Sequence, residues 1–424
     1  MRARPLLAGA LAALLLAGCA PTPPAVPEGS PAPTAEAPVL SPSPALPSPA
    51  PEPDPVEEAL SSMTLEEKVG QLLLVGIEGT EPGEDARRAI QDYHAGGVIL
   101  FGRNVESAEQ LLALTNGLKA LDQGQVPLFL GVDQEGGRVD RMPPEVLRTP
   151  SAYAVGGGWD GSQAARDRAS AYGAALSAAC AAFGFSLDFA PVADVWSDPD
   201  NTVIGDRSFG SDPEAVGEQA LLAAQAMAAG GTVPVAKHFP GHGSTATDSH
   251  LSLPVVDEAL EDWTEGDFLP FRRYMDSAAV GEVPAPMMVG HILLTALDGD
   301  YPASLSEKVV TGFLREEQGY EGVLFTDDLT MGAVTEHYGL GEAAVLAVQA
   351  GCDVVLVCHG QENVDTVRAA LLEAAKAGAI APERLDQSVR RILSLKEAAG
   401  LTSAPAEAPD LEALNAQIGA LTAD

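Results

Sequence analysis

The stretch Gly322-Val323-Leu324-Phe325-Thr326-Asp327-Asp328 is an apolar run that ends in two carboxylates. A short, continuous apolar run of this kind is typical of a strand that is buried on both faces, as in a parallel sheet. A longer, alanine-rich stretch with helical periodicity follows it. This pairing of strand and helix recurs along the chain, so we expect a fold built from βα units.

Eight such apolar runs precede helical stretches. They lie at residues 71–77, 97–101, 127–132, 186–192, 233–238, 286–291, 322–326 and 353–358. Eight βα units close most economically into an α/β fold of the (β/α)8 TIM-barrel type. A doubly wound open sheet is the alternative, but it usually carries a glycine-rich nucleotide turn after its first strand. Residues 76–80, Gly-Ile-Glu-Gly-Thr, lack that pattern, so we predict the barrel.

The composition excludes several classes of function. Sixty acidic and 24 basic residues give a formal net charge of −36, which repels the phosphates of nucleic acids. Four cysteines in a chain of this length cannot form a disulfide scaffold, and the absence of a C-x-x-C pair argues against structural zinc. Cys352 and Cys358 share one predicted strand, about 20 Å apart, and cannot pair with each other. We expect Cys180, among alanines, to be a core residue.

The amino terminus has the pattern of an export signal. Arg2 and Arg4 precede an apolar run at residues 5–17, which is too short to span a bilayer but suits a signal peptide. The run ends Leu-Ala-Gly-Cys at residues 16–19, which resembles the lipobox of bacterial lipoproteins. We therefore expect a signal peptide at 1–18, acylation of Cys19, and an extracytoplasmic protein held at the membrane by its lipid alone. An ordinary signal peptide with an incidental cysteine is the alternative.

The rest of the chain divides by composition. Residues 19–55 are rich in Pro, Ala and Ser without an aromatic residue, which predicts a disordered linker. At roughly 3.1 Å per residue, this linker would reach about 100 Å from the anchor. Thr64 and Glu67 match a capping box, and we place the folded domain at 56–401. The tail at 402–424 forms one helix or frays. We expect a monomer.

Polar residues gather where four predicted strands end. Asp133 and Asp327 follow the third and seventh runs, His291 ends the sixth, and Lys237 and His238 end the fifth. Barrel enzymes carry their sites at the carboxyl ends of the strands, so these residues predict one site at the barrel mouth. There, Asp327 could act as a nucleophile or base, while its neighbour faces elsewhere as a cap or acceptor. The alternative is that both carboxylates cap the next helix.

Two histidine patterns have different implications. His238 and His242 are four residues apart, but Pro240 and Gly241 between them prevent a helix, which argues against a zinc pair. In Asp248-Ser249-His250, the carboxylate could orient the imidazole and favour its charged form. Such a histidine can donate and recover a proton. Taken alone, this motif is more often a solvated loop.

Two arginines complete the predicted site. Arg141 follows the third strand, and Arg207 lies in the segment 201–209. With Lys237 and His238, they would make a locally positive, donor-rich pocket for hydroxyl-rich or acidic ligands. Taken singly, each arginine is as well explained by a surface ion pair.

Together these segments resemble glycoside hydrolase family 3, in its β-N-acetylglucosaminidase branch. The matching segments are residues 132–139, 201–209, 237–243, 248–250 with 253–254, and 326–329. The resemblance implies a barrel enzyme that removes terminal β-linked N-acetylglucosamine from peptidoglycan fragments with retention of configuration. It implies no metal and no organic cofactor.

The resemblance also implies roles for individual residues. Asp327 matches the nucleophile, and His250 paired with Asp248 matches the acid and base. The sugar would be held by Asp133, Arg141, Arg207, Lys237 and His238, and we add His291 to this binding set. Ser244 departs from the family, whose members commonly carry aspartate at this point.

Three alternatives to hydrolysis of N-acetylglucosaminides stay open. A neutral imidazole repels phosphate less than a carboxylate does, so the protein could be a phosphorylase. A β-glucosidase of the same family is disfavoured, because that branch takes its acid residue from a second domain and we expect none here. The third alternative is a sugar-binding lipoprotein without catalysis.

Overall fold

The computed structural model describes residues 54–422, except 123, 125, 246–248, 250 and 251. The predicted signal peptide, Cys19 and all but the last two residues of the predicted linker lie outside these residues. Among the described residues, no helix has the length and hydrophobicity needed to cross a membrane.

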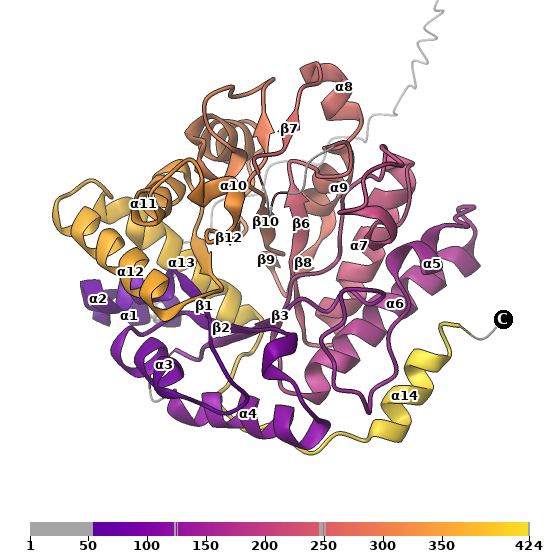
Figure 1. The fold of residues 1–424 in the computed structure, drawn as a ribbon, viewed down its shortest axis with the longest axis horizontal. Helices are drawn as coiled ribbons and strands as arrows, with labels where there is room; N and C mark the ends of the chain where they lie inside the picture. Colours follow the sequence, from indigo (N-terminus) through magenta and orange to yellow (C-terminus); the bar gives the residue numbers. More distant parts are fainter. Residues whose placement is uncertain (1–53, 123, 125, 246–248, 250–251, 423–424) are drawn as a thin grey trace, which may run out of the picture. The chain divides into compact units, whose positions relative to one another are not determined.

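A single parallel sheet forms the centre of the fold (Figure 1). Its strands run in the order β5-β4-β3-β2-β1-β13-β12-β10-β6. Their bounds are β1 Leu73–Gly76, β2 Gly97–Leu100, β3 Phe129–Val132, β4 Leu187–Asp188, β5 Val233–Pro234, β6 Ala236–Phe239, β10 Met287–Val289, β12 Leu324–Asp328 and β13 Val354–Val357. Each lies within or overlaps one of the eight predicted runs. The (β/α)8 barrel is therefore confirmed.

The ring of strands closes through the fifth predicted strand, which is divided into two parts. β5 pairs with β4, and β6 pairs with β10 on the other side. Val235 stands between the two parts, and its N–H donates to the carbonyls of Asp188 and Ala190. One stretch of chain thus joins both ends of the sheet.

Helices surround this ring (Figure 1). The longer helices are α1 Pro55–Ser62, α2 Leu65–Gln71, α4 Ala108–Leu121, α6 Gln163–Ala182, α7 Pro213–Ala229, α9 Leu269–Ser277, the π-helix η5 Lys308–Glu317, α11 Leu340–Ala350, α12 Gln361–Lys376, α13 Pro382–Ala398 and α14 Leu411–Gly419. Shorter elements are α3 Glu84–Arg87, α5 Ala152–Gly156, α8 Leu260–Glu265, α10 Gly332–Thr335, β7 Val255–Val256, β8 Ala279–Val280, β9 Val283–Pro284 and β11 Leu293–Leu294. The predicted capping box of Thr64 and Glu67 is present at the start of α2.

Aromatic rings fill the inside of the barrel. The ring of Phe325 makes edge contacts with the rings of Phe129 and Phe189, at centroid distances of 6.5 and 5.5 Å. Gly97 makes room for this packing, because a Cβ there would lie 2.5 Å from Leu74 Cδ1. The inside of the barrel is therefore a packed core.

The three described cysteines are free and buried, as we predicted. Cys352 and Cys358 flank β13, and Cys180 lies in α6. They contribute to packing and do not link segments of the chain.

Candidate active site

A cavity of about 340 Å³ opens at the carboxyl ends of the strands. Its polar and charged lining consists of Asp133, Glu135, Arg141, Arg207, Lys237, His238, His242, Ser249, Asp327, Asp328, Thr330 and His359. These residues come from the ends of β3, β6, β12 and β13 and from the loops that follow the strands. The structure thus brings six of the predicted site residues to one cavity.

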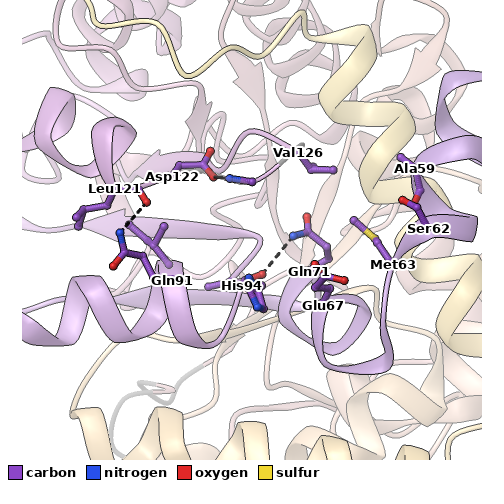
Figure 2. A pocket seen from close by; sticks show the side chains of 13 residues that line it. Ala59, Ser62, Met63, Glu67, Gln71, Gln91, His94, Leu121, Asp122 and Val126 are labelled. Atoms are coloured by element: carbon purple, nitrogen blue, oxygen red, sulfur yellow. Dashed lines mark hydrogen bonds between the residues drawn. The ribbon is translucent and has the colours of Figure 1, made fainter.

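A larger cavity, of about 720 Å³ (Figure 2), is lined by residues shortly before β1, β2 and β3, so it lies at the amino ends of the strands. It is bordered by α1, α2 and the segments that precede β2 and β3. Its amides serve the fold, since Gln71 donates to the carbonyl of His94 and Gln91 donates to that of Leu121 (Figure 2). Barrel enzymes do not carry catalysis at this end. The smaller cavity, at the carboxyl ends of the strands, is therefore the candidate active site.

A buried network of charges forms one wall of the smaller cavity. The Arg207 guanidinium donates to both oxygens of Glu135, at 2.7 and 2.8 Å. Lys237 Nζ lies 2.7 Å from Glu135 Oε1 and 2.5 Å from Asp133 Oδ1. Burial raises the pKa of Glu135, but Arg207 and Lys237 outweigh it and hold that pKa well below its usual range. Glu135 is therefore ionised, although only 2% of its side chain is exposed.

This network corrects our expectation of a locally positive pocket. Among the described residues, three permanent cations and four carboxylates line the cavity. Sequence reasoning counted the cations but assigned no role to Glu135, which forms ion pairs with Arg207 and Lys237. Arg141 is the exception, because its guanidinium has no hydrogen-bond or ion-pair partner among the described residues and its Nε is buried. Arg141 is thus the cation left for a ligand.

A second buried carboxylate, Asp194, fixes His238. Asp194 Oδ2 lies 2.7 Å from His238 Nδ1, and Oδ1 accepts the backbone N–H groups of His238 and His242. Burial raises the pKa of Asp194, but the neighbouring His238 has the larger combined effect, and the pKa lies below its ordinary value. His238 Nε2 lies 3.4 Å from Arg207 Nη2. Sequence reasoning missed Asp194, although it follows the fourth predicted strand.

Asp327 lies at the end of β12 and lines the cavity. Its Oδ1 accepts the backbone N–H of Asp328 at 2.8 Å. Burial raises the pKa of Asp327, but His238, His291, this N–H and Lys237 together lower it below its ordinary value. An ionised carboxylate at the cavity wall can act as a nucleophile toward carbon.

Asp328 has a different role. Its Oδ1 accepts the N–H groups of Thr330 and Cys358, and its Oδ2 accepts the Thr330 hydroxyl at 2.6 Å. It thereby ties β12 to the end of β13. Neither Asp327 nor Asp328 caps α10, because its N-cap is Met331 and has no side-chain hydrogen bond. The helix-cap alternative therefore does not apply.

His291 lies behind the cavity wall, where we expected a sugar-binding residue. It is fully buried and is not part of the cavity lining. The Ser304 hydroxyl lies 2.7 Å from Nδ1, and Nε2 lies 3.0 Å from the Asp328 carbonyl, to which it donates. Burial lowers the pKa of His291, so the neutral imidazole supports the end of β12 from behind.

Asp248 and His250 lie outside the described residues. Ser249, between them in sequence, lines the cavity. Its hydroxyl is 3.1 Å from His242 Nε2, and its carbonyl accepts the N–H of Ala333. The described part of this loop is therefore attached to the cavity wall on two sides.

Ser244, the departure from the family pattern, has a definite partner. Its hydroxyl donates to Asp267 Oδ2 at 2.6 Å. Asp267 is 4% exposed, and burial raises its pKa to about 7 despite this hydrogen bond. The pair joins the loop after β6 to the start of α9.

Replacing Asp267 by asparagine should stabilise the protein at high pH. The folded state keeps a proton on Asp267 up to about pH 7, whereas the unfolded chain loses it near the ordinary value of 3.8. The folded state binds more protons, so wild-type stability falls as the pH rises through this window. We expect the free energy of unfolding of Asp267→Asn, relative to that of the wild type, to increase by about 1–3 kcal/mol from pH 5 to pH 8.

Urea unfolding of both proteins at pH 5, 6.5 and 8 measures this effect. Asp276→Asn, in an exposed position on α9, is the matched control and should show no such gain. Parallel pH profiles of Asp267→Asn and the wild type would contradict the prediction.

Comparisons with known proteins agree with this geometry. Residues 64–395 match the glycosyl hydrolase family 3 N-terminal domain. A β-hexosaminidase from Alkalilimnicola ehrlichii is 40% identical over 296 residues, 70% of this chain and 82% of that protein. The β-hexosaminidase LpqI from Mycobacterium tuberculosis is 38% identical over 343 residues, 78% of this chain and 82% of that protein.

Solved structures give the same picture. A family 3 β-N-acetylglucosaminidase from Paenibacillus sp. matches with a TM-score of 0.78 and 36% identity, over 85% of this chain and 68% of that one. NagZ from Neisseria gonorrhoeae, solved with N-trifluoroacetyl-D-glucosamine, matches with a TM-score of 0.67 and 34% identity, over 83% of this chain and 98% of that one.

Proposed function

The chain belongs to glycosyl hydrolase family 3, and from this premise we propose that it is an exo-acting β-N-acetylhexosaminidase that removes terminal β-linked N-acetylglucosamine. The observation that carries the proposal is the placement of Asp327. It is an ionised carboxylate that lines the same cavity as Arg141, whose guanidinium has no partner among the described residues. Relatives named β-hexosaminidase support the choice of sugar.

We propose a retaining mechanism in two steps. Asp327 attacks C1 of the sugar, and the bond from C1 to the leaving oxygen breaks as His250 gives that oxygen a proton. The His250 imidazole then takes a proton from water, whose oxygen displaces Asp327 from C1. Retaining glycosidases usually use two carboxylates about 5 Å apart, and here His250 with Asp248 replaces the second.

The charge network supports binding of a polyhydroxylated ring. Asp133, Lys237 and His238 present acceptors and donors that are held in place by buried partners. Fixed donors and acceptors of this kind orient a ligand at little entropic cost. We propose that these residues hold the sugar hydroxyls and that Arg141 and Arg207 contribute further donors.

We further propose that the substrates are peptidoglycan fragments and that the protein is an extracytoplasmic lipoprotein. The Leu-Ala-Gly-Cys sequence at residues 16–19 and the proline-rich linker support an acylated Cys19 that holds a monomer near the cell wall. Mass spectrometry of the mature protein from its native membrane tests this directly. A protein that begins at Cys19 and carries fatty acids is expected, and an unmodified cysteine would contradict the anchor.

Chromogenic substrates test the activity. We expect nitrophenol release from 4-nitrophenyl N-acetyl-β-glucosaminide and about a hundredfold lower kcat/KM for the β-glucoside, because the acetamido contacts are lost. Phosphate should not change the product. Formation of sugar 1-phosphate would identify a phosphorylase, and calorimetric binding of N-acetylglucosamine without turnover would identify a non-catalytic protein. Purified peptidoglycan fragments, resolved by mass, then test the substrate.

A further inference from the structure

The loop after β3 carries much of the candidate site. Residues 133–151 run from Asp133 through Glu135 and Arg141 and reach α5 at Ala152. The half nearest the cavity is held from within the loop. The Arg141 N–H donates to Gln134 Oε1, and the Asp140 carboxylate accepts N–H groups from both halves of the loop.

The outer half of this loop is held by the last helix of the chain. Asn415 Oδ1 accepts the backbone N–H of Leu147 at 2.6 Å, and Asn415 Nδ2 donates to the Glu145 carbonyl at 2.9 Å. The Glu145 carboxylate also accepts the N–H of Ala108. Within the part of the chain that the structure describes, these are the hydrogen bonds that residues 143–148 make outside the loop.

Helix α14, which carries Asn415, is itself packed against the rest of the domain. Leu414 and Ile418 are buried, and α14 packs against α6 (Figure 1). The connecting segment is also fixed, because Ala406 exchanges two hydrogen bonds with the Asn116 side chain. The family match ends at residue 395, so α14 lies outside the matched domain.

The contact between Asn415 and the loop matters for the site because the same loop carries Arg141. Lys237 and Arg207 are held in place by buried carboxylates, whereas the Arg141 guanidinium has no partner among the described residues. Its position therefore follows from the backbone of the loop. We propose that Asn415 is a positioning residue that fixes this loop and so places Arg141 for substrate binding.

Asn415→Ala tests the inference in the full chain. Loss of one or two hydrogen bonds should raise KM for the chromogenic substrate by about 3- to 30-fold and leave kcat within about twofold. Gln417→Ala, an exposed position on the same helix, is the matched control and should behave as the wild type. Asn415→Asp keeps the acceptor for Leu147 but loses the donor to Glu145. Its KM should lie between those of the wild type and Asn415→Ala.

Hydrogen exchange adds a measurement that does not depend on the proposed function, on which the kinetic part rests. The Leu147 amide should exchange faster in Asn415→Ala than in the wild type, with a thermal midpoint that stays within a few degrees. An unchanged KM would overturn the inference. A lower kcat together with a higher KM and a lower thermal midpoint would also overturn it, because that combination indicates only a less stable fold. If the wild type hydrolyses nothing, the proposed function fails, and unchanged exchange at Leu147 would then overturn this inference separately.

Discussion

Asp327→Ala should lower kcat/KM for the N-acetyl-β-glucosaminide by about 10³- to 10⁵-fold while the protein stays folded. The carboxylate supplies the electron pair that bonds to C1, and no other described carboxylate can take its place. Asp133 and Glu135 are held by Lys237 and Arg207, and Asp328 accepts three hydrogen bonds from the β12–β13 region. Steady-state kinetics with the chromogenic substrate measures the loss.

Two further measurements separate a nucleophile from a binding residue. A 5-fluoro N-acetylglucosaminyl fluoride should lose fluoride and label Asp327, which peptide mass spectrometry would locate. Azide should restore part of the turnover in Asp327→Gly and give the α-glycosyl azide, because azide enters the vacated side of C1. Asp206→Asn, at an exposed rim position paired with Arg138, is the control and should keep its activity. More than a tenth of wild-type activity in Asp327→Ala would refute the assignment.

The barrel followed from the sequence because its signal is local. Each strand is a short apolar run, and eight of them leave few other ways to bury both faces of a sheet. The division of the fifth strand could not be predicted. Val233 to His238 was predicted as one strand, and the break at Val235 arises because its two parts pair with different strands. Pairing depends on partners that are distant in sequence.

The same limit explains what was missed in the site. Asp133, Lys237 and Asp327 could be assigned to the candidate site because each stands at or next to the end of a predicted strand. The partnership of Glu135 with Arg207 spans 72 residues, and that of Asp194 with His238 spans 44. Counting cations at strand ends therefore predicted a positive pocket, although carboxylates from other loops face them.

His291 and Asn415 are two residues whose places in the structure could not be predicted from the sequence. His291 ends a predicted strand, as His238 does, but it bonds to Ser304 and to the Asp328 carbonyl and does not line the cavity. Asn415 carries no local signal at all, since its partner Leu147 is 268 residues away. Side-chain direction and long-range contact are properties of the assembled barrel, and only the structure provides them.

Glu135→Gln should lower the free energy of unfolding by about 3–5 kcal/mol, the cost of leaving buried charges without their partner. Glutamine matches glutamate in shape but cannot neutralise Arg207 and Lys237, whose side chains are 14% and 3% exposed. Its amide also turns one acceptor into a donor that faces donors. Urea unfolding at pH 7 measures the loss. Glu78→Gln, which removes an exposed pair with Arg103, is the control and should cost less than about 1 kcal/mol.

The pH dependence distinguishes this account from a simple packing defect. The folded-state pKa of Glu135 lies below its ordinary value of 4.5, so its contribution is present above that value and is lost only as the pH falls through the folded-state pKa. The gap between wild type and Glu135→Gln should therefore stay constant from pH 8 to about pH 5 and narrow below that. Replacing Arg207 by methionine in the same variant should recover part of the loss, because it removes one of the unpaired charges. The single variant Arg207→Met completes the comparison. If Arg207→Met lowers the free energy of unfolding by the same amount in Glu135→Gln as in the wild type, the two side chains are not energetically coupled, and this account of the network is wrong.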